Sequence, residues 1–420
     1  MAICIVTLGP STRGEVTSYT LKPNRTANFG SPVSWFSSLL WLGLSCVAKE
    51  LDHQRPAPSL DVPSHFPPVP ALEDWTPSQE SVLLGRWLFY DVRLSKDATR
   101  SCGICHEQEK AFTDGLVRSI GINNTPLSRN ALSLVNVAWR TELTWSGQFP
   151  DVATHMSDPL FTAEPVEMGM TEALLKQRLT NSDIYPALFA QAFPDDDDPI
   201  TANNAIRAIA DFTRTIISGD SPYDRWLQGD NTLNESALRG MDLFYGSKMN
   251  CAACHDGLFF DAPAADVLSE QRHGYFNTGQ YDIDGLGSYP PHSSGLFEQT
   301  GQPEDTGRFR TPSLRNLTAT YPWSHDGTHL TLADRLADYA RGGRKLDSGP
   351  HQGDGRDNPY KSDLITGFEM TEGEGQDLLS FLQALDDDHL LVAPDLATPF
   401  CVTRRGVVIN EPCEPPFSLD

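Results

Sequence analysis

The sequence predicts a mainly α-helical protein made of two similar domains, with long irregular loops and few strands. Helical periodicity dominates the chain, and capping boxes mark two helix starts, at 76–79 and 371–374. Strand-like alternation is scarce, while Gly and Pro punctuate long loops such as 257–310. A short pattern, Gly-x-x-Leu-Phe-Tyr, occurs at 85–90 and again at 240–245, which indicates an internal duplication.

Helices are expected wherever apolar residues recur at helical spacing behind a cap. The first should open at Thr76-Pro77-Ser78-Gln79, with Pro at the first helical position, and run to about Tyr90. The others are expected at about 171–180, 184–193, 202–218, 235–246, 331–341 and 371–386. Helices 202–218 and 371–386 would each close one copy of the duplicated unit.

Length and charge narrow the class of protein. The 420 residues are enough for two or three compact domains. The formal net charge is −24, whereas nucleic-acid-binding proteins carry a basic surface, so the charge argues against that class. The same acidity suits a soluble protein that meets a partner through complementary charge.

The N-terminus predicts export. Lys22 and Arg25 precede an apolar run at 35–44 that is too short to span a bilayer comfortably. Small residues follow, and cleavage is expected near Ala48 or just before Cys46. We therefore expect a periplasmic protein. Cleavage before Cys46 would make it a lipoprotein, and that lipid anchor would be its only link to a membrane.

Two CxxCH motifs are the most specific feature, at Cys102-Gly-Ile-Cys105-His106 and Cys251-Ala-Ala-Cys254-His255. A c-type haem needs two thiols about one helical turn apart and an adjacent histidine to bind its iron. Zinc knuckles and redox dithiols are the alternatives, but neither explains a histidine after both pairs. We predict two covalently attached c-type haems, with His106 and His255 as the proximal iron ligands.

The haem motifs divide the chain into segments. The predicted boundaries are a targeting segment at 1–48, a Pro-rich linker or wrapping arm at 49–73, an N-terminal haem domain at 74–220, a C-terminal haem domain at 221–390 and a Pro-rich tail at 391–420. The fold class is thus mainly α, with two cytochrome c-like haem domains. In the tail, Cys401 and Cys413 are expected to form a disulfide, with two free thiols as the alternative.

The ligand on the far side of each iron decides the chemistry, because an open position can bind peroxide. After His255 the only methionine is Met370, at the cap of the last helix, so methionine ligation of the second haem is not expected. No histidine lies between His106 and His155, which favours an open first haem that reacts with peroxide.

Further motifs occur in order over about residues 75–386, and with them the chain resembles the bacterial di-haem cytochrome c peroxidase and MauG superfamily. They are Ser128-Arg-Asn130-Ala-Leu-Ser-Leu-Val-Asn136, Trp145-Ser-Gly-Gln148, Glu164-Pro-Val-Glu167-Met-Gly169, Arg310-Thr-Pro-Ser-Leu-Arg-Asn316 and His325-Asp-Gly327. The chain looks most similar to the MauG and MbnH branch, whose members oxidise a residue of a partner protein. Two departures are Trp-Ser-Gly-Gln in place of the usual WDGR and a slightly lengthened stretch before Glu167.

The resemblance implies roles for residues near the first haem. Trp145 would lie between the haems and relay electrons, with a core tryptophan as the alternative. Glu167 would move a proton during O–O cleavage, with a loop carboxylate or helix cap as the alternative. Pro159 would form the distal pocket wall. His155, where relatives often have glutamine, would assist peroxide protonation unless it is an ordinary polar histidine.

For the second haem the resemblance implies Tyr339 as the far iron ligand, and a packed helix tyrosine is the alternative. The other available ligands are His273, His292, His329 and His351, while His325 is expected in a structural turn. A calcium ion between the haems is also implied, and Asn130, Thr311 and Pro312 are the residues that fit it.

The predicted function is that of a di-haem peroxidase. Hydrogen peroxide would form a high-valent intermediate shared by two haems, which oxidises an aromatic residue of a partner protein. In the MbnH branch the implied reaction converts a tryptophan of the partner MbnP to kynurenine. One alternative is a cytochrome c peroxidase that receives electrons from a small cytochrome. The other is a non-catalytic di-haem electron carrier.

Overall fold

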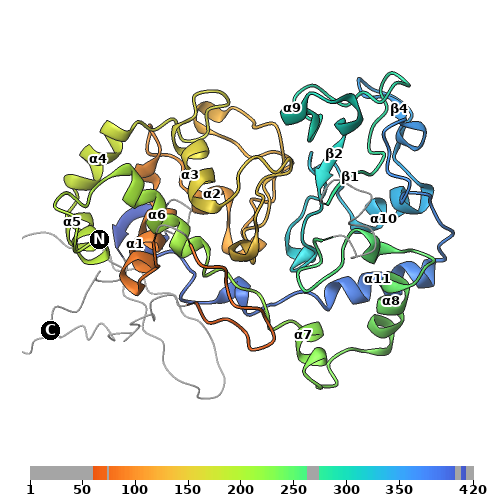
Figure 1. Cartoon of the computed structure of the whole chain (residues 1–420), viewed down its shortest axis with the longest axis horizontal. Helices are drawn as coiled ribbons and strands as arrows, with labels where there is room; N and C mark the ends of the chain where they lie inside the picture. Colours follow the sequence, from red (N-terminus) through yellow and green to blue (C-terminus); the bar gives the residue numbers. More distant parts are fainter. Residues whose placement is uncertain (1–59, 73–74, 263–273, 403–407, 413–420) are drawn as a thin grey trace, which may run out of the picture. The chain divides into compact units, whose positions relative to one another are not determined.

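The computed structural model describes residues 60–72, 75–262, 274–402 and 408–412. Within these residues the chain is mainly helical, and its six short strands form three antiparallel pairs (Figure 1). The predicted fold class is therefore confirmed. The predicted targeting segment at 1–48 and Cys413 lie outside the described residues, as does the side chain of Cys401. No described helix is long and apolar enough to cross a bilayer.

The helices and strands have the following bounds. The helices are α1 (Gln79–Tyr90), α2 (Cys102–Cys105), α3 (Val152–Phe161), α4 (Glu172–Thr180), α5 (Tyr185–Ala192), α6 (Ala202–Thr213), α7 (Pro222–Leu227), α8 (Glu235–Tyr245), α9 (Phe297–Thr300), α10 (Leu332–Arg341) and α11 (Glu372–Gln383). The strand pairs are β1 (Tyr275–Asn277) with β2 (Arg308–Arg310), β3 (Lys345–Leu346) with β4 (Gly353–Asp354), and β5 (Phe400–Val402) with β6 (Val408–Pro412).

All seven predicted helices are present, with small differences at their ends. The cap of α1 is Ser78, which forms a capping box with Ser81, so the helix begins two residues later than the sequence pattern predicts. The helix predicted at 202–218 ends at Thr213, because backbone groups of the following residues form hydrogen bonds with Asn136 and not within the helix. The carbonyl of Ile216 accepts from the amide of Asn136, and Ser218 pairs with the Asn136 side chain in both directions.

The duplicated glycines allow two helix pairs to pack closely. In one half α1 packs on α6, and a Cβ added at Gly85 would overlap the carbonyl oxygen of Ala208 and lie 2.9 Å from the Cβ of Phe212. In the other half α8 packs on α11, and a Cβ at Gly240 would overlap the carbonyl oxygen of Asp377. The sequence repeat is thus a repeat of structure, since each glycine admits a neighbouring backbone.

We expect Gly85→Ala and Gly240→Ala each to lower the free energy of unfolding by about 1–3 kcal/mol, because the added methyl overpacks a rigid helix contact. Gly373→Ala is the matched control, since Gly373 lies in α11 with open space around it. That change should stabilise the protein by about 0.5–1 kcal/mol, because alanine restricts the unfolded chain. Denaturant unfolding of the three variants measures the expected loss and the expected gain in the free energy of unfolding. Equal changes for Gly85→Ala and Gly373→Ala would contradict the close contact at Gly85.

The cores of the two halves are distinct, and the C-terminal segment 390–400 belongs to the first. Leu390, Ala393, Leu396 and Phe400 are buried in the same apolar cluster as α1 and α6, and the ring of Phe400 meets Trp87 edge-on at 5.1 Å. Figure 1 shows this blue segment returning beside α1. The residues just after the predicted boundary at 390 therefore complete the N-terminal core.

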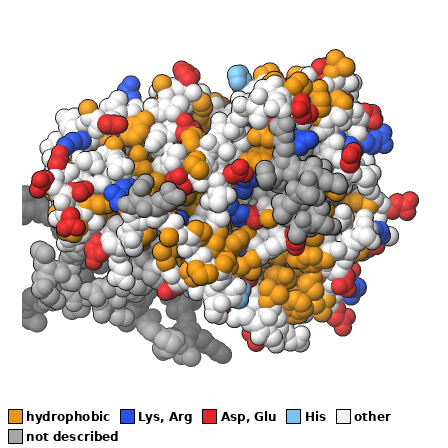
Figure 2. All heavy atoms as spheres, in the orientation of Figure 1, with side chains coloured by type: hydrophobic (Ala, Val, Ile, Leu, Met, Phe, Trp, Pro, Cys, Tyr) orange, Lys and Arg blue, Asp and Glu red, His pale blue; other side chains and the backbone are white. Residues whose placement is uncertain are grey.

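The described part of the N-terminal arm, 60–72, bridges the two halves. Phe66 is buried, and its ring contacts Trp139 at 5.6 Å and Phe259 at 5.3 Å, both edge-on. The indole of Trp139 donates to the carbonyl of Pro67. On the face drawn in Figure 2, charged side chains are scattered, while hydrophobic side chains, which include proline, gather in the lower part.

Candidate functional site

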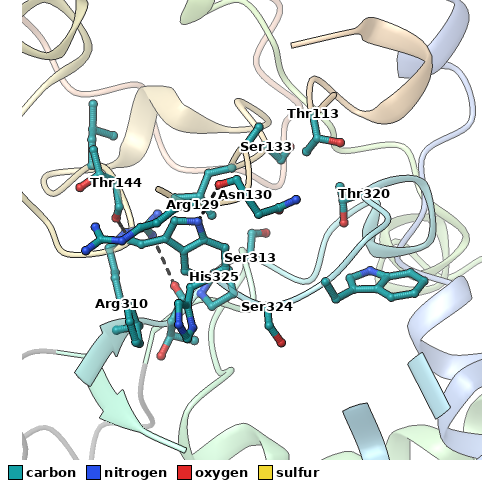
Figure 3. A pocket seen from close by; sticks show the side chains of 18 of the residues that line it. Thr113, Arg129, Asn130, Ser133, Thr144, Arg310, Ser313, Thr320, Ser324 and His325 are labelled. Carbon is teal, nitrogen blue, oxygen red and sulfur yellow. Dashed lines mark hydrogen bonds between the residues drawn. The ribbon is translucent and has the colours of Figure 1, made fainter. Parts of the chain in front are cut away.

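One cavity of about 1230 Å³ is lined by both CxxCH motifs. Its wall combines residues that follow the first motif, α3, residues 309–325 and α10. Figure 3 shows how Arg129, Asn130 and Ser133 of one segment face Arg310, Ser313 and His325 of another across this space. The volume exceeds the roughly 300–1,000 Å³ of pockets for ordinary small ligands, so the cavity has room for a large cofactor.

The first CxxCH motif presents a neutral histidine ready to bind metal. Cys102–Cys105 forms the single turn α2, and the backbone N–H of His106 donates to the carbonyl of Cys102 at 2.9 Å. The Nδ1 of His106 lies 2.7 Å from the carbonyl of Phe112. Because a carbonyl can only accept, Nδ1 carries the proton and Nε2 keeps its lone pair. Burial lowers the pKa of His106, which favours this neutral form.

The second motif repeats this geometry. The backbone N–H of His255 donates to the carbonyl of Cys251 at 2.9 Å, and Nδ1 lies 3.1 Å from the carbonyl of Phe260. Burial lowers the pKa of His255 to about 4, so this imidazole is also neutral at pH 7. The four CxxCH cysteines are free thiols that line the cavity, as attachment of two porphyrins requires.

Two equivalent serines hold the loops that orient these histidines. Ser133 donates to the carbonyl of Ala111, and Ser313 donates to the carbonyl of Phe259, each at 2.6 Å. These carbonyls directly precede Phe112 and Phe260, whose own carbonyls fix the two histidines. The same second layer of hydrogen bonds therefore supports both candidate metal ligands.

Basic side chains gather on the cavity wall of this acidic chain. The wall contains Arg100, Arg129, Arg140, Arg310 and Arg335. The Nε atoms of Arg100 and Arg129 are buried and find no partner among the described residues. Burial lowers the pKa of Arg310 and of Arg140, and neighbouring arginines lower that of Arg140 further. Glu298 pairs with Arg129 and Asp261 pairs with Arg140, while the other cationic groups suit an anionic ligand such as a haem propionate.

Glu167, His155 and Pro159 lie together on the side of the first motif. His155 and Pro159 belong to α3, and the segment carrying Glu167 is tied across the end of α3 by the Met168 amide, which donates to the Pro159 carbonyl at 3.1 Å. Burial, and then the negative charge of Asp158, raise the pKa of Glu167 to about 7. A carboxyl with this pKa can both accept and donate a proton at neutral pH.

His155 is neutral at pH 7, because burial and the nearby His106 lower its pKa to about 4. Its ring lies 4.9 Å from that of Phe149. A neutral imidazole in this place can donate or accept a hydrogen bond but carries no charge.

Trp145 lines the cavity and contacts both halves. Its indole nitrogen donates to the carbonyl of Asn130 at 2.9 Å, and its carbonyl accepts from the amide of Arg310 at 2.8 Å. Its ring meets that of His325 edge-on at 6.2 Å. The backbone bridge Leu143–Phe149 around Trp145 matches the bridge Trp323–His329 around His325, so these two rings occupy equivalent places in the repeat.

The comparisons with known proteins agree with this geometry. A family model described as di-haem cytochrome c peroxidase matches residues 79–232. The methylamine utilization protein MauG of Methylorubrum extorquens is 34% identical over 319 residues, which are 76% of this chain and 81% of that protein. The chain belongs to the di-haem cytochrome c peroxidase and MauG family. As a member it is a haem-dependent oxidoreductase that carries two haems.

Two further relatives show the breadth of the likeness. Cytochrome c551 peroxidase of Nitrosomonas europaea is 32% identical over 276 residues, which are 65% of this chain and 77% of that protein. A crystal structure of a MauG-like protein associated with microbial copper homeostasis is 42% identical, with a TM-score of 0.77. The match covers 81% of this chain and 99% of that one.

Tyr339 of this di-haem family member lines the cavity from α10, and the guanidinium of Arg335 lies 4.1 Å from its ring centre. Among the other predicted ligands, His292 lines the cavity, and His351 packs against Tyr281 at 5.8 Å. His273 lies outside the described residues. Met370 packs in the apolar core of the second half.

His329 has both ring nitrogens engaged. Nδ1 lies 2.7 Å from the hydroxyl of Ser324, and Nε2 lies 2.6 Å from the carboxylate of Asp338. Asp338 directly precedes Tyr339 on α10, so this pair ties the helix that carries Tyr339 to the cavity rim.

The residues predicted for calcium lie on the wall of the same cavity. Asn130, Thr311 and Pro312 all line the cavity. The side-chain amide nitrogen of Asn130 donates to the carbonyl of Leu116 at 2.7 Å, which turns its amide oxygen the other way. Among the described residues no group of three or more His, Cys, Asp or Glu side chains could hold a metal ion.

Sequence reasoning missed the arginines of the wall and the position of His325. The arginines have no fixed spacing that a pattern could detect. His325 lies in a turn, as expected, but it is also buried against Phe309 at 3.7 Å and lines the cavity. A signal for it was available, because its HisAspGly segment occupies the same place in the repeat as the TrpSerGly segment of Trp145.

Proposed function

We propose that this protein reduces hydrogen peroxide at its first haem and uses the resulting oxidising equivalents on an aromatic residue, a tryptophan, of a partner protein. The observation that carries the proposal is Glu167, a carboxyl group with a pKa near 7 on the cavity wall that also holds the first CxxCH motif. Its likeness to MauG and to the MauG-like structure supports the choice of a protein substrate.

The chain's own residues would hold both cofactors. Cys102 and Cys105 would bind one haem and Cys251 and Cys254 the other, with His106 and His255 as proximal iron ligands and Tyr339 as the far ligand of the second iron. The wall arginines would neutralise the propionates. Bound haem iron supplies the redox chemistry of peroxide cleavage.

Glu167 moves the proton. As a carboxylate it takes the proton from the bound peroxide oxygen, and as the acid it returns that proton to the leaving oxygen, which departs as water. His155, neutral at pH 7, hydrogen-bonds the peroxide, and Pro159 limits the pocket. Trp145 passes electrons between the two haem sites through its position against His325.

Tyr339→Phe tests the assignment at the second haem. We expect the visible absorption and EPR signals of the second ferric haem to change, because a phenyl ring cannot bind iron, while the signals of the first haem stay as in the wild type. The first haem thereby serves as the control within the same molecule. Identical spectra for both haems in the variant would remove Tyr339 from the ligand set.

Mixing the ferric holoprotein with hydrogen peroxide tests the function itself. A peroxidase gives a fast spectral change, whereas a non-catalytic electron carrier with both irons closed gives little. Incubation with peroxide and an MbnP-like candidate partner should then increase the mass of the partner by oxidation. Rapid turnover of reduced cytochrome c without a mass change would instead establish the second candidate, a cytochrome c peroxidase, which the name of the Nitrosomonas relative favours.

Three further features belong to the same proposal. We place the protein in the periplasm, either free or held by lipid on Cys46. We assign a calcium ion to Asn130 and the backbone of Thr311 and Pro312, since carbonyl and amide oxygens are the ligands that calcium prefers. We also propose that the two haem domains span residues 74–220 and 221–390.

A further inference from the structure

Two aromatic side chains connect the cavity with the surface. Trp323 lines the cavity, and the ring of Tyr321 meets it edge-on with 5.6 Å between centres. Tyr321 is 43% exposed, so the pair reaches from the cavity wall to solvent in a single ring-to-ring contact. Tryptophan and tyrosine are also the two side chains that lose an electron most easily among the aromatic residues.

The backbone fixes Trp323 at the rim. Its amide donates to the carbonyl of His329 at 3.0 Å, the amide of His329 donates back at 3.3 Å, and the indole nitrogen donates to the carbonyl of Leu317 at 3.0 Å. The indole N–H of Trp323 is therefore held in a hydrogen bond to the backbone. Leu330 directly follows the bridged His329, and Tyr321 stands two residues before the bridged Trp323.

Exposed apolar side chains from both halves lie on the loop that carries Tyr321 and on the segment that touches this loop. Leu330 is exposed, and so are Leu116 and Val117, which precede the first domain's cavity wall at Ser119. Val117 touches the loop that carries Leu330, because a Cβ added at Gly327 would lie 2.7 Å from the Cα of Val117. Four of the nine large hydrophobic side chains exposed among the described residues thus gather at this junction.

We propose that Trp323 and Tyr321 form an electron relay between the haem cavity and a partner protein that docks on Tyr321, Leu330, Leu116 and Val117. The inference rests on the proposed function and names the exit it requires. A side chain that is part of a folded partner cannot enter the cavity, so its electrons must cross the wall. The exposed apolar residues around Tyr321 provide a dry contact for an aromatic side chain.

The electrons and protons that pass through the relay balance. Reduction of one hydrogen peroxide to two waters consumes two protons and two electrons. Each electron passes from Trp323 toward the cavity and is replaced from Tyr321, whose phenol proton goes to water. The partner's aromatic side chain then returns an electron to Tyr321, which recovers a proton from solvent. Two such passages per peroxide leave the partner oxidised by two electrons.

Tyr245 shows that an exposed tyrosine needs a contact with the cavity wall to serve as a relay residue. It is also 43% exposed, and it shares a hydrogen bond with Tyr223, but neither tyrosine lines the cavity. The ring of Tyr245 packs on Phe244 at 5.1 Å and on Phe381 at 6.4 Å, and phenylalanine is much harder to oxidise. Tyr245→Phe is therefore the matched control for Tyr321→Phe. Trp139→Phe is the control for Trp323→Phe, since Trp139 packs on Phe66 and Phe259 at the arm.

The experiment treats each ferric holoprotein with hydrogen peroxide and a nitroso spin trap, then maps the adduct by peptide mass analysis. In the wild type we expect the adduct on the peptide that carries Tyr321. Tyr321→Phe and Trp323→Phe should remove it, and both should slow oxidation of reduced cytochrome c, a donor too large for the cavity, by about tenfold or more. The small donor hydroquinone should be oxidised at the wild-type rate.

The outcomes separate the relay from the proposed function. If the wild type shows no spectral reaction with peroxide, the proposed function fails and the relay fails with it. If the wild type reacts but the adduct forms elsewhere, or Tyr321→Phe behaves like Tyr245→Phe, the relay is overturned while the peroxidase function stands. Loss of the adduct in Tyr321→Phe and Trp323→Phe alone, with unchanged peroxide reaction, supports the relay.

Discussion

Replacing Glu167 with glutamine is expected to slow the reaction of the ferric protein with hydrogen peroxide by about 10²- to 10⁴-fold, the usual contribution of a positioned acid–base group. Glutamine keeps the size and the hydrogen-bonding capacity of the side chain but cannot take or return a proton. Stopped-flow absorbance of the haems measures the rate. Glu172→Gln, an exposed change in the first turn of α4, is the control and should leave the rate unchanged.

The wild-type rate should also depend on pH in a defined direction. Because the carboxylate must first accept a proton from peroxide, the rate should rise with pH and level off above about 7, where Glu167 is ionised. Asp158→Asn removes the negative charge that helps to raise this pKa, so the midpoint should move to lower pH. A Glu167→Gln protein that keeps the wild-type rate and pH profile would exclude Glu167 as the proton carrier.

Replacing Arg315 with methionine is expected to lower the free energy of unfolding by about 3–5 kcal/mol, the cost of leaving a buried charge without its partner. Both side chains of the Arg315–Asp224 pair are fully buried, and two bonds of 2.8 Å join them. Although burial alone would raise it, hydrogen bonding to Arg315 keeps the pKa of Asp224 below its usual value. Without Arg315, burial would raise the pKa of Asp224, so the group would either stay charged without its main partner or take up a proton, and both outcomes cost stability.

Arg315 also supports the second haem motif, because its Nε donates to the carbonyl of Leu258 at 2.9 Å, in the loop that leads to Phe260 and fixes His255. Denaturant unfolding measures the loss of stability. Adding Asp224→Asn to Arg315→Met should recover part of it, since no unpaired charge remains. Arg239→Met, which breaks an exposed pair with Asp377, should change stability little. A double variant no more stable than the single one would refute this electrostatic account.

The parts of the site that follow strict spacing were predictable from the sequence. A haem demands two thiols and a histidine in one turn, so the CxxCH motifs identify their histidines without a structure. The equivalence of Gly85 and Gly240 also followed, because the same six-residue pattern stands in front of both motifs. The cavity arginines come from separate segments, and the Ser324–His329–Asp338 contacts depend on how a turn packs against α10, so no local pattern encodes either.

Four helices of the described residues were not predicted: the single turns α2 and α9, and the longer α3 and α7, which escaped for local reasons. Pro159 lies inside α3, where its missing N–H ordinarily ends a helix. In α3 it occupies the last turn, and the Thr162 amide closes that turn on the Asp158 carbonyl. The other, α7, has only six residues, too few for a periodic pattern, and is held by its Ser221–Asp224 capping box and the Asp224–Arg315 pair.

The return of residues 390–400 to the first half sets an order of events during biogenesis. The hydroxyl of Tyr90 donates to the carbonyl of Leu396, and Gln108, two residues after the first haem-binding histidine, donates to the carbonyls of Leu390 and Ala393. The half of the molecule that is synthesised first is thus sealed by a segment that is synthesised after the second half. Until residues 390–400 have been synthesised, the side of the first CxxCH motif that they cover stays uncovered.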